Sequence, residues 1–409
     1  MSLLFKLGWR NIWRNKRRSI ITILAVVFAV MLSIVMRAIQ LGTYEVNIRH
    51  VVELFSGYIQ IQMPGYQKSP TLQKSFHNSD SLQALLQQRP EVIASAPRVI
   101  GDGLTSFRDN SQGALLVGVD PLRERNVSKL DGRVVHGRFL DPDRQDAIVV
   151  GDKLLQNLHA QIGDTIVVLA QGFDGSMGNL KYVIIGSVKT GLGEFDRSLV
   201  LMNLAAAQDL MVMYGRANVL AVRLHDLDEI QDVQQALQPT LKRMGLRALS
   251  WSQVMPDLEQ SIKLDNISGI LMLGILVFVV AFGITNTVLM SVTERFREFG
   301  IVLSIGMQQQ KLVFLVFLET IMILLVGLII GNLCAYGINY YLHLHPIEFT
   351  GEFADIYAEY GFLPRLEATL RFSSFFNTTL SIFGISILAT LYPVAKVLKL
   401  EPLKGIRYT

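Results

Sequence analysis

Cysteine is almost absent from this sequence of 409 residues, which contains only Cys334. A single thiol cannot form an intrachain disulfide, so the fold must be stable without covalent cross-links. The cysteine lies inside an apolar run and gives no indication of a redox compartment.

The sequence also lacks the motifs of common catalytic centres. It has no G-x-x-x-x-G-K-[ST] loop, which excludes ATP hydrolysis by a P-loop in this chain. It has no H-E-x-x-H and no G-x-S-x-G, and His343 and His345 near the end of an apolar run are interpreted as surface residues. We therefore predict no catalytic residue, no metal site and no cofactor bound by this chain.

Long apolar runs are abundant, in a chain with 50% hydrophobic and 18% charged residues. Four runs reach the roughly 20 residues that cross a hydrocarbon core. The first run exceeds the usual apolar core of a secretory signal and lacks a cleavage site, so we interpret it as an uncleaved anchor. The predicted transmembrane segments are 19–41, 263–292, 312–342 and 375–395.

The basic residues outside these segments are unevenly distributed. Residues 1–18 contain six Lys or Arg, the loop 293–311 three and the tail 396–409 four, including Lys396, Lys399, Lys404 and Arg407. The loop 343–374 has two, against five Asp or Glu. The positive-inside rule therefore places both termini and 293–311 in the cytoplasm, and the loop 343–374 and residues 42–262 outside.

Residues 42–262 must then form one extracytoplasmic domain, which we predict to be α+β. "YIQIQM", "SDSLQALLQQ" and "EVIASAPRV" have the order strand, helix, strand, and residues 218–251 repeat that order. This pattern predicts a ferredoxin-like split βαβ fold. The strand candidates between the two units predict a separate β subdomain inserted at about 101–215; the alternative is a single irregular α+β domain.

The N-terminal stretch 1–18 predicts an amphipathic helix. Phe5, Trp9, Ile12 and Trp13 share one face, and the cations lie elsewhere. Such a helix can lie at the membrane interface with its cations facing anionic lipid, or can serve only to fix the topology.

The loop 293–311 is about twice as long as a plain helix connection needs. Glu294, Arg295, Arg297 and Glu298 supply charge, and Phe296, Phe299, Val302 and Leu303 supply an apolar side. Gly306 is placed to end this helix. The pattern predicts a rigid cytoplasmic helix between two spans, although an interfacial helix without a partner would give a similar pattern.

Glu319 is the only ionisable residue within the third span. Charged groups in lipid are costly and usually face protein or water, so we interpret Glu319 as a structural contact between spans rather than a proton relay. Small residues follow it on the same segment and indicate close helix packing: Gly327, Gly331, Ala335 and Gly337.

Three cytoplasmic stretches carry a resemblance to a known family: "LGWRNIWRNKRRSIITIL", "ERFREFGIVLSIGMQQQKL" and "YPVAKVLKLEPLKGIRY". They resemble the signatures of FtsX/MacB/Lol-type, or type VII, ABC transporter permeases. The resemblance implies a MacB-like periplasmic core domain and a coupling helix that docks on a separate dimeric ATPase, which binds the ATP and Mg. The implied coupling residues are Glu294, Arg295, Arg297, Glu298, Phe299, Gly300 and Gly306.

The long middle of the chain looks most like Lol-type lipoprotein-releasing permeases. In those proteins, residues 170–186 would fall where one permease carries a hook that recruits a periplasmic chaperone. The corresponding residues here are Gly172, Phe173, Asp174 and Met177. The loop lacks the expected proline, so an ordinary hairpin is the favoured interpretation.

The resemblance implies transport of lipoproteins or other amphiphiles from the outer leaflet of a bacterial inner membrane by mechanotransmission. The implied partners are the ATPase, a second identical or paralogous permease subunit, a periplasmic chaperone or adaptor, and membrane lipid, but no nucleic acid. The alternatives are MacB-like efflux and an FtsX-like permease that regulates an external protein. Apolar residues of spans one and two are predicted to line a lateral cavity when two such subunits pair: Ile34, Val35, Ile39, Ile267, Leu271 and Ile275.

Overall fold

The computed structural model describes residues 2–14, 16–77, 80–359 and 362–398. Lys399, Lys404 and Arg407 of the predicted cytoplasmic tail therefore lie outside the described residues. The chain divides into two compact units. The helical unit comprises Met1–Tyr44, Ile262–Glu348 and Arg365–Thr409, and the sheet unit comprises Glu45–Ser261 and Phe349–Pro364.

Four long helices account for the predicted spans: α2 (Lys16–Val51), α10 (Pro256–Glu294), α12 (Gln309–Leu344) and α14 (Phe372–Leu398). Each contains a window long and apolar enough to cross a membrane. Helix α2 has 36 residues, and at 1.5 Å per residue it is about 54 Å long, well beyond a hydrocarbon core of about 30 Å. Both α2 and α10 therefore continue past the predicted transmembrane segments as unbroken helices.

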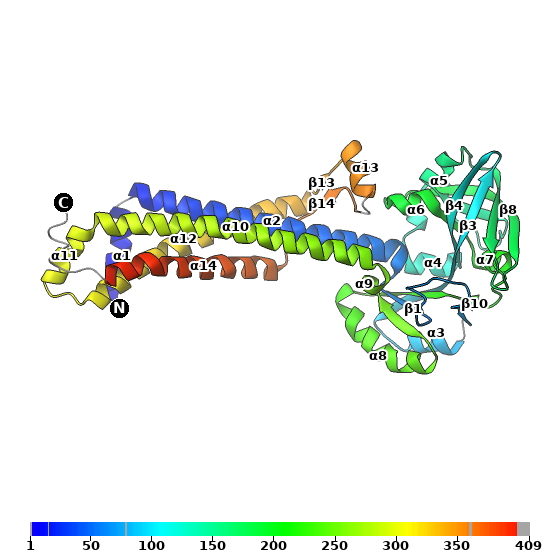
Figure 1. The fold of residues 1–409 in the computed structure, drawn as a ribbon, viewed down its shortest axis with the longest axis horizontal. Coiled ribbons are helices and arrows are strands. Elements are labelled where there is room, and N and C mark those ends of the chain that lie inside the picture. The colour runs from blue at the N-terminus through cyan, green and yellow to red at the C-terminus, as the bar shows by residue number, and fades with distance from the viewer. Residues whose placement is uncertain (1, 15, 78–79, 360–361, 399–409) are drawn as a thin grey trace. The chain divides into compact units, whose positions relative to one another are not determined.

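Two short helices lie at one end of the helical unit, α1 (Ser2–Arg14) and α11 (Phe296–Ser304) (Figure 1). The strands β13 (Ile347–Glu348) and β14 (Arg365–Leu366) form a small antiparallel ribbon. Between these strands in sequence, helix α13 (Glu352–Glu359) belongs to the sheet unit. The predicted loop 343–374 thus contains secondary structure that its acidic composition did not reveal.

Glycines on α12 bring it close to α2. A Cβ atom added at Gly327 would lie 2.6 Å from Val26, and one added at Gly331 would lie 2.8 Å from Val30. Both distances are shorter than any normal contact, so these positions need glycine. Gly337 differs, because an added Cβ meets nothing within 4 Å there. The interpretation of close packing therefore applies to the first part of the small-residue series and not to Gly337.

The first half of the sheet unit has the strand order β12-β1-β11-β3, and every neighbouring pair is antiparallel. Helices α3 and α8 connect β1 to β3 and β11 to β12. This is the order of a ferredoxin-like split βαβ fold, so the predicted fold is confirmed. The bounds are β1 (Ile59–Gln62), α3 (Asp80–Gln87), β3 (Val92–Phe107), β11 (Val219–Leu224), α8 (Ile230–Arg243) and β12 (Arg247–Ser250).

The inserted strands extend the same sheet instead of forming a second one. Strand β3 is 16 residues long: its first part pairs with β11 and its second part pairs with β7, while β4 pairs along its other side. The predicted boundary near residue 101 therefore falls inside β3, where Gly101 and Gly103 resemble a strand end in sequence. The inserted strands are β4 (Asn110–Val119), β5 (Val134–Gly137), β6 (Ala147–Gly151), β7 (Thr165–Gln171), β8 (Met177–Val188) and β9 (Leu199–Asn203).

Short elements complete the sheet unit, and apolar side chains pack on both faces of its inserted part. The strands β2 and β10 pair with one another beside the main sheet. These elements are η1 (Val52–Ser56), β2 (Phe76–His77), α4 (Pro121–Val127), η2 (Asp131–Arg133), α5 (Asp152–Asn157), α6 (Gly193–Ser198), α7 (Leu204–Leu210), β10 (Arg216–Ala217), η3 (Leu227–Glu229) and α9 (Trp251–Val254).

Candidate functional site

Helix α11 is a distinct segment between the second and third long helices. Arg295, with φ −97° and ψ 7°, interrupts the helix between Glu294 and Phe296. At the other end Gly306 has φ +103°. The Met307 N–H donates to the Val302 carbonyl at 3.2 Å and the Gly306 N–H to that of Leu303 at 3.0 Å. Glycine is favoured in this left-handed conformation, so Gly306 lies just past the end of helix α11, where the sequence predicted that the helix would end.

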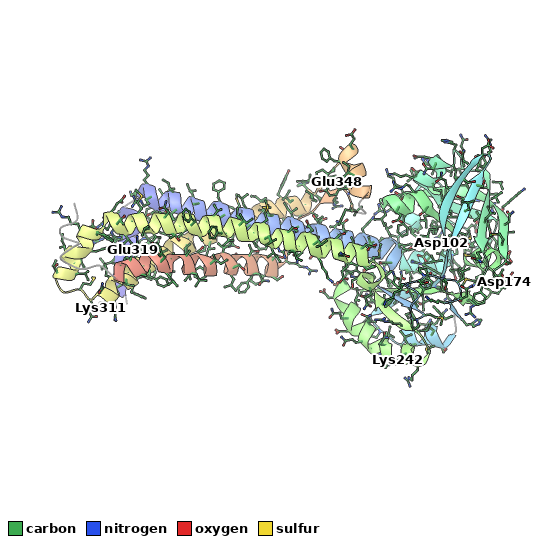
Figure 2. All side chains as sticks on the ribbon, in the orientation of Figure 1. Asp102, Asp174, Lys242, Lys311, Glu319 and Glu348 are labelled. Atoms are coloured by element: carbon green, nitrogen blue, oxygen red, sulfur yellow. The ribbon has the colours of Figure 1, made fainter. Side chains whose placement is uncertain are left out.

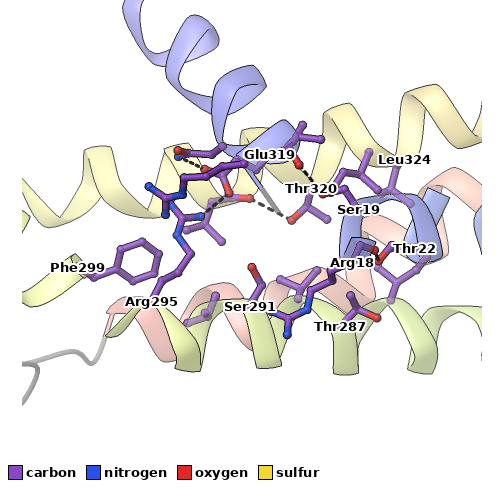
Figure 3. A pocket seen from close by; sticks show the side chains of 18 residues that line it. Arg18, Ser19, Thr22, Thr287, Ser291, Arg295, Phe299, Glu319, Thr320 and Leu324 are labelled. Atoms are coloured by element: carbon purple, nitrogen blue, oxygen red, sulfur yellow. Dashed lines mark hydrogen bonds and ion pairs between the residues drawn. The ribbon is translucent and has the colours of Figure 1, made fainter. Parts of the chain in front are cut away.

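The buried contact of α11 with the bundle is an ion pair. Arg295 Nη1 lies 2.9 Å from Glu319 Oε2, and the two side chains are only 15% and 12% exposed. Asn11 Nδ2 donates to the other oxygen of Glu319 at 2.7 Å. Figure 3 shows Glu319 and Arg295 pointing toward one another across the helices. Helix α1, the start of α11 and helix α12 are thereby joined at one carboxylate.

Two further ion pairs surround this contact. Arg18 binds Glu294 through both guanidinium nitrogens, at 2.5 Å each, and Arg14 binds Glu298 at 2.5 Å. Partial burial raises the pKa of Glu298, but hydrogen bonds from Arg14 and Arg295 outweigh it and hold that pKa below the usual value. The bidentate pair fixes α2 against the end of α10 more firmly than a single contact would. We call Asn11, Arg14, Arg18, Glu294, Arg295, Glu298 and Glu319 the polar cluster.

A small cavity of about 60 Å³ lies beside the polar cluster. Arg18, Ser291 and Thr320 contribute polar groups to its lining (Figure 3). Its walls come from α1, α2, α10, α11 and α12. Five segments thus meet around one incompletely filled volume at this end of the bundle.

The structure corrects which residues of α11 are available to a partner. Phe299 and Gly300 are buried. The guanidinium of Arg295 lies over the Phe299 ring, 4.9 Å from its centroid, and is therefore on the same inward side. Phe299, Gly300 and Arg295 therefore face the bundle and do not form an outer docking surface. Sequence could not show this, because the helix carries apolar residues on more than one side.

The outward face of α11 is made of Arg297, Ile301 and Ile305. Arg297 is exposed, Ile301 is 46% exposed and Ile305 is 81% exposed. Exposed large apolar side chains that lie together are typical of an interaction surface. Here two exposed isoleucines lie next to an exposed cation at one end of the bundle. We call these three residues the outer face of α11.

Sequence reasoning identified Glu319 and α11 but missed their partners on the N-terminal segment. Asn11, Arg14 and Arg18 recur at helical spacing and all contact acidic residues far along the chain. The one available signal was the need of a carboxylate in a membrane span for a donor, and this signal does not say where in the chain the donor lies.

Helix α1 has a buried side and an exposed aromatic side. Phe5, Trp9 and Trp13 are 57%, 47% and 44% exposed, whereas Ile12 is buried. The prediction that Ile12 shares the face of Phe5, Trp9 and Trp13 is therefore wrong. The inward side of α1 also includes Gly8, where an added Cβ atom would lie 3.6 Å from Glu319 and 3.7 Å from Met322. The exposed aromatics and the cations of the helix remain suited to a membrane interface.

The six residues predicted to line a lateral cavity do not share one surface. Ile34 is buried in the apolar core of the bundle, and Val35 and Ile39 are partly buried. Ile267, Leu271 and Ile275 on α10 are 55%, 64% and 66% exposed. The prediction for Ile34 is wrong because the buried face of α2 carries Val26, Val30 and Ile34 at helical spacing.

Helix α10 has the least protected apolar surface of the four long helices. Only 17% of its most apolar window is buried, against 33% to 44% for the others. Its exposed face continues from Ile267 to Phe278 and Phe282. Lipid or another membrane-embedded chain must cover this face in the membrane.

The predicted hook residues form a tight turn between β7 and β8. The Gly172 N–H donates to the Ser176 carbonyl at 2.8 Å, and Asp174 accepts from the Ser176 N–H and hydroxyl. The hydroxyl and N–H of Ser176 lower the pKa of Asp174. The Phe173 ring lies under the Arg216 guanidinium at 4.9 Å, and Met177 is 70% exposed. The segment is thus an ordinary hairpin.

Residues 19–240 match the MacB-like periplasmic core domain, and residues 270–402 match the FtsX-like permease C-terminal domain. The chain therefore belongs to the FtsX/MacB-type family of ABC transporter permeases. By family it is an inner-membrane permease subunit with a periplasmic domain and not itself an ATPase. The resemblance drawn from the three sequence stretches is confirmed.

Curated relatives include both lipoprotein-releasing and export proteins. The lipoprotein-releasing system transmembrane protein LolC of Xylella fastidiosa is 25% identical, over 85% of this chain and 88% of that protein. The corresponding LolE of Haemophilus influenzae is 20% identical over 80% of each chain. The macrolide export ATP-binding/permease protein MacB 2 of Aeromonas hydrophila is 25% identical over 62% of this chain, but only 39% of that protein is covered.

Proposed function

We propose that this protein is a permease subunit that releases lipoproteins, or similar amphiphiles, from the outer leaflet of the inner membrane. Its similarity to LolC and LolE along most of both chains supports this substrate class. The exposed apolar face of α10 is suited to acyl chains, because no charged residue interrupts it from Ile267 to Phe282.

The protein draws its energy from a separate dimeric ATPase, which binds ATP and Mg in the cytoplasm. The ATPase docks on the outer face of α11, where Arg297, Ile301 and Ile305 are exposed. The distribution of Lys and Arg supports a cytoplasmic location for this end and for both termini.

The observation that carries this mechanism is the polar cluster. A displacement of α11 acts on α12 through Arg295 and Glu319, and on α1 through Glu298 and Arg14. Glu294, which ends α10 directly before Arg295, is bound by Arg18 of α2. Helix α2 ends, and helix α10 begins, among the residues of the sheet unit, and both helices are unbroken. A movement at α11 is therefore passed along two rigid helices. The spans thus transmit force without containing a polar conduit.

Complex formation and turnover test this proposal. The protein is purified with a candidate ATPase of the same organism and reconstituted in nanodiscs, alone and with a candidate second permease subunit. ATPase rate is then measured with a triacylated lipoprotein and with the same protein lacking its acyl chains. We expect stimulation and release only with the acylated form. Equal rates with both forms would remove the lipoprotein assignment.

MacB-like efflux is the second candidate, supported by the match to the macrolide export protein. It predicts stimulation by a small amphiphilic drug and association with an adaptor, but no release of lipoprotein. A regulatory permease of the FtsX kind predicts an external protein partner and no lipid-dependent turnover. The same reconstituted complex distinguishes these outcomes.

A further inference from the structure

The sheet unit contains a cavity of about 490 Å³ beside the long strand β3. Along one edge of β3, pairing with β11 ends at Arg98 and pairing with β7 begins at Gly103. At Ile100, between them, the side chain of Asn218 replaces a strand partner: it accepts from the N–H at 2.9 Å and donates to the carbonyl at 2.6 Å. The exchange of partner strands therefore leaves a space at the sheet edge, and no backbone group of Ile100 is left unpaired.

Residues 64–75 cover this space and are held in place by their own side chains. Lys74 Nζ donates to the carbonyls of Gly65 and Ser69 at 2.9 and 2.8 Å. Gln67 donates to the Val254 carbonyl at 2.6 Å, and Gln73 donates to the Phe173 carbonyl at 3.0 Å. The cover is tied to the surrounding elements, so the cavity is preformed.

One wall of the cavity contains a buried hydrogen-bond acceptor that has no partner among the described residues. Gln60 Nε2 donates to the Ser56 carbonyl at 2.7 Å, which fixes its amide orientation because a carbonyl can only accept. Gln60 Oε1 then accepts from Gln62 Nε2 at 2.7 Å. Gln62 is 1% exposed, and its Oε1 has no partner among the described residues. An unpaired carbonyl in a low-dielectric wall leaves negative potential there.

Charge in the cavity has one sign. Asp102, labelled in Figure 2, is its only charged lining residue among those described, and no Lys, Arg or His lines it. The nearby cation Lys74 is bonded within the covering segment. Burial, and to a smaller extent the charge of Asp102, raise the pKa of the Tyr66 hydroxyl. A cation would find one counter-charge here, the exposed carboxylate of Asp102, and an anion would find none among the described lining residues.

The other lining residues combine side-chain amides with apolar groups, and the size is suitable for a ligand. The volume lies within the roughly 300–1,000 Å³ of small-molecule sites, which combine apolar walls with a few placed polar groups. The apolar lining residues are Phe55, Leu72, Ile100, Leu115, Phe195 and Val219.

We propose that this cavity binds a small amphipathic amine, with its ammonium group near Asp102 and its apolar body against Ile100 and Leu115. The site belongs to the sheet unit, whereas the outer face of α11 and the exposed face of α10 belong to the helical unit. It is therefore a ligand site in addition to the proposed lipoprotein path, and its occupancy does not depend on that function.

Three probes of similar size test the charge preference. Leucyl-leucinamide carries the ammonium, N-acetyl-leucyl-leucinamide lacks it, and N-acetyl-leucyl-leucine is an anion. Binding to the full-length protein in nanodiscs is measured by saturation-transfer NMR. We expect the amine to bind, the neutral probe to bind at least fivefold more weakly, and the anion not to bind. Equal binding of all three, or binding of none, would overturn the proposal.

Variants locate the site. Asp102→Asn should weaken amine binding about five- to tenfold and leave the neutral probe unchanged, while Asp109→Asn at the exposed β3–β4 turn should change neither. Thr71→Trp places bulk in the cavity from an exposed position and should abolish binding of the amine. Folding of each variant is checked by its thermal unfolding. Unchanged amine binding in both Asp102→Asn and Thr71→Trp would refute this location.

Discussion

Arg295 and Glu319 form an ion pair with an N–O distance of 2.9 Å and join the start of the short helix α11 to the third long helix. Both side chains are largely buried, so their contact differs in energy from the exposed pair of Arg14 and Glu298. Exposed pairs contribute about 0–1 kcal/mol, whereas breaking a buried pair by removing one partner costs about 3–5 kcal/mol. The buried pair therefore holds the start of α11 to α12 more strongly than the exposed pair of Arg14 and Glu298 holds α11 to α1, beside the apolar packing of Phe299.

The first prediction concerns this pair. Glu319→Gln should remove the buried counter-charge of Arg295, which keeps only its exposed partner Glu298 at 3.3 Å, and destabilise the bundle by about 3 kcal/mol, the lower end for a buried pair because both side chains keep some exposure. Thermal unfolding in detergent and coupled ATPase rate both measure the loss. The charge exchange Arg295→Glu with Glu319→Arg should recover part of it. If Glu319→Gln matches the parent in both measurements, the pair does not connect these helices energetically.

The second prediction concerns the outer face of α11. Ile301→Glu and Arg297→Glu should weaken association with the ATPase at least tenfold, because they place unfavourable charge at the proposed contact. The bundle should unfold at the parent temperature, since both side chains are exposed. Co-purification and light scattering measure the complex. Arg243→Glu on the exposed side of α8 is the charge-matched control, and loss of the ATPase in that variant too would contradict a specific contact.

Local pattern made much of the fold predictable. The length of the apolar runs predicted the four spans, and the order of the periodic segments predicted the split βαβ sheet. Both features depend on residues that are close together in the sequence. The partners of Glu319 and Glu294 were not predictable, since Asn11 and Arg18 lie 308 and 276 residues away in sequence. The direction of Ile34 was also hidden, because a helix that is apolar all round does not show which face meets its neighbours.

The third prediction concerns glycine on α12. Gly327→Ala should push against Val26, where the new Cβ would be 2.6 Å away, and destabilise the bundle by about 1–3 kcal/mol. Val26→Ala in the same chain should relieve the clash only in part, because it removes Cγ1 but leaves Cβ at 2.7 Å, so the double variant should lose less stability than the sum of the two single changes. Gly337→Ala is the control: its Cβ meets nothing, so helix propensity should make it neutral or stabilising by up to about 1 kcal/mol. Destabilisation of equal size at Gly327 and Gly337 would show that packing against Val26 is not the cause.

The fourth prediction concerns a buried ion pair of the sheet unit. Arg98 and Glu124 are 1% and 0% exposed, with 2.6 Å between Nη2 and Oε1, and Arg98 also donates to the Phe55 carbonyl. Arg98→Met should lower the free energy of unfolding by about 3–5 kcal/mol, because it leaves the Glu124 carboxylate buried without a counter-charge.

Adding Glu124→Leu to Arg98→Met should restore most of this stability, since an apolar pair of similar volume has no charge to desolvate. Recovery should stop short of the parent, because the Phe55 carbonyl has lost its donor, which costs about 1–3 kcal/mol. Urea unfolding monitored by Trp251 fluorescence, in a full-length chain with Trp9 and Trp13 replaced by Phe, measures the sheet unit. A double variant less stable than Arg98→Met alone would show that the pair is needed for its charge and not merely tolerated.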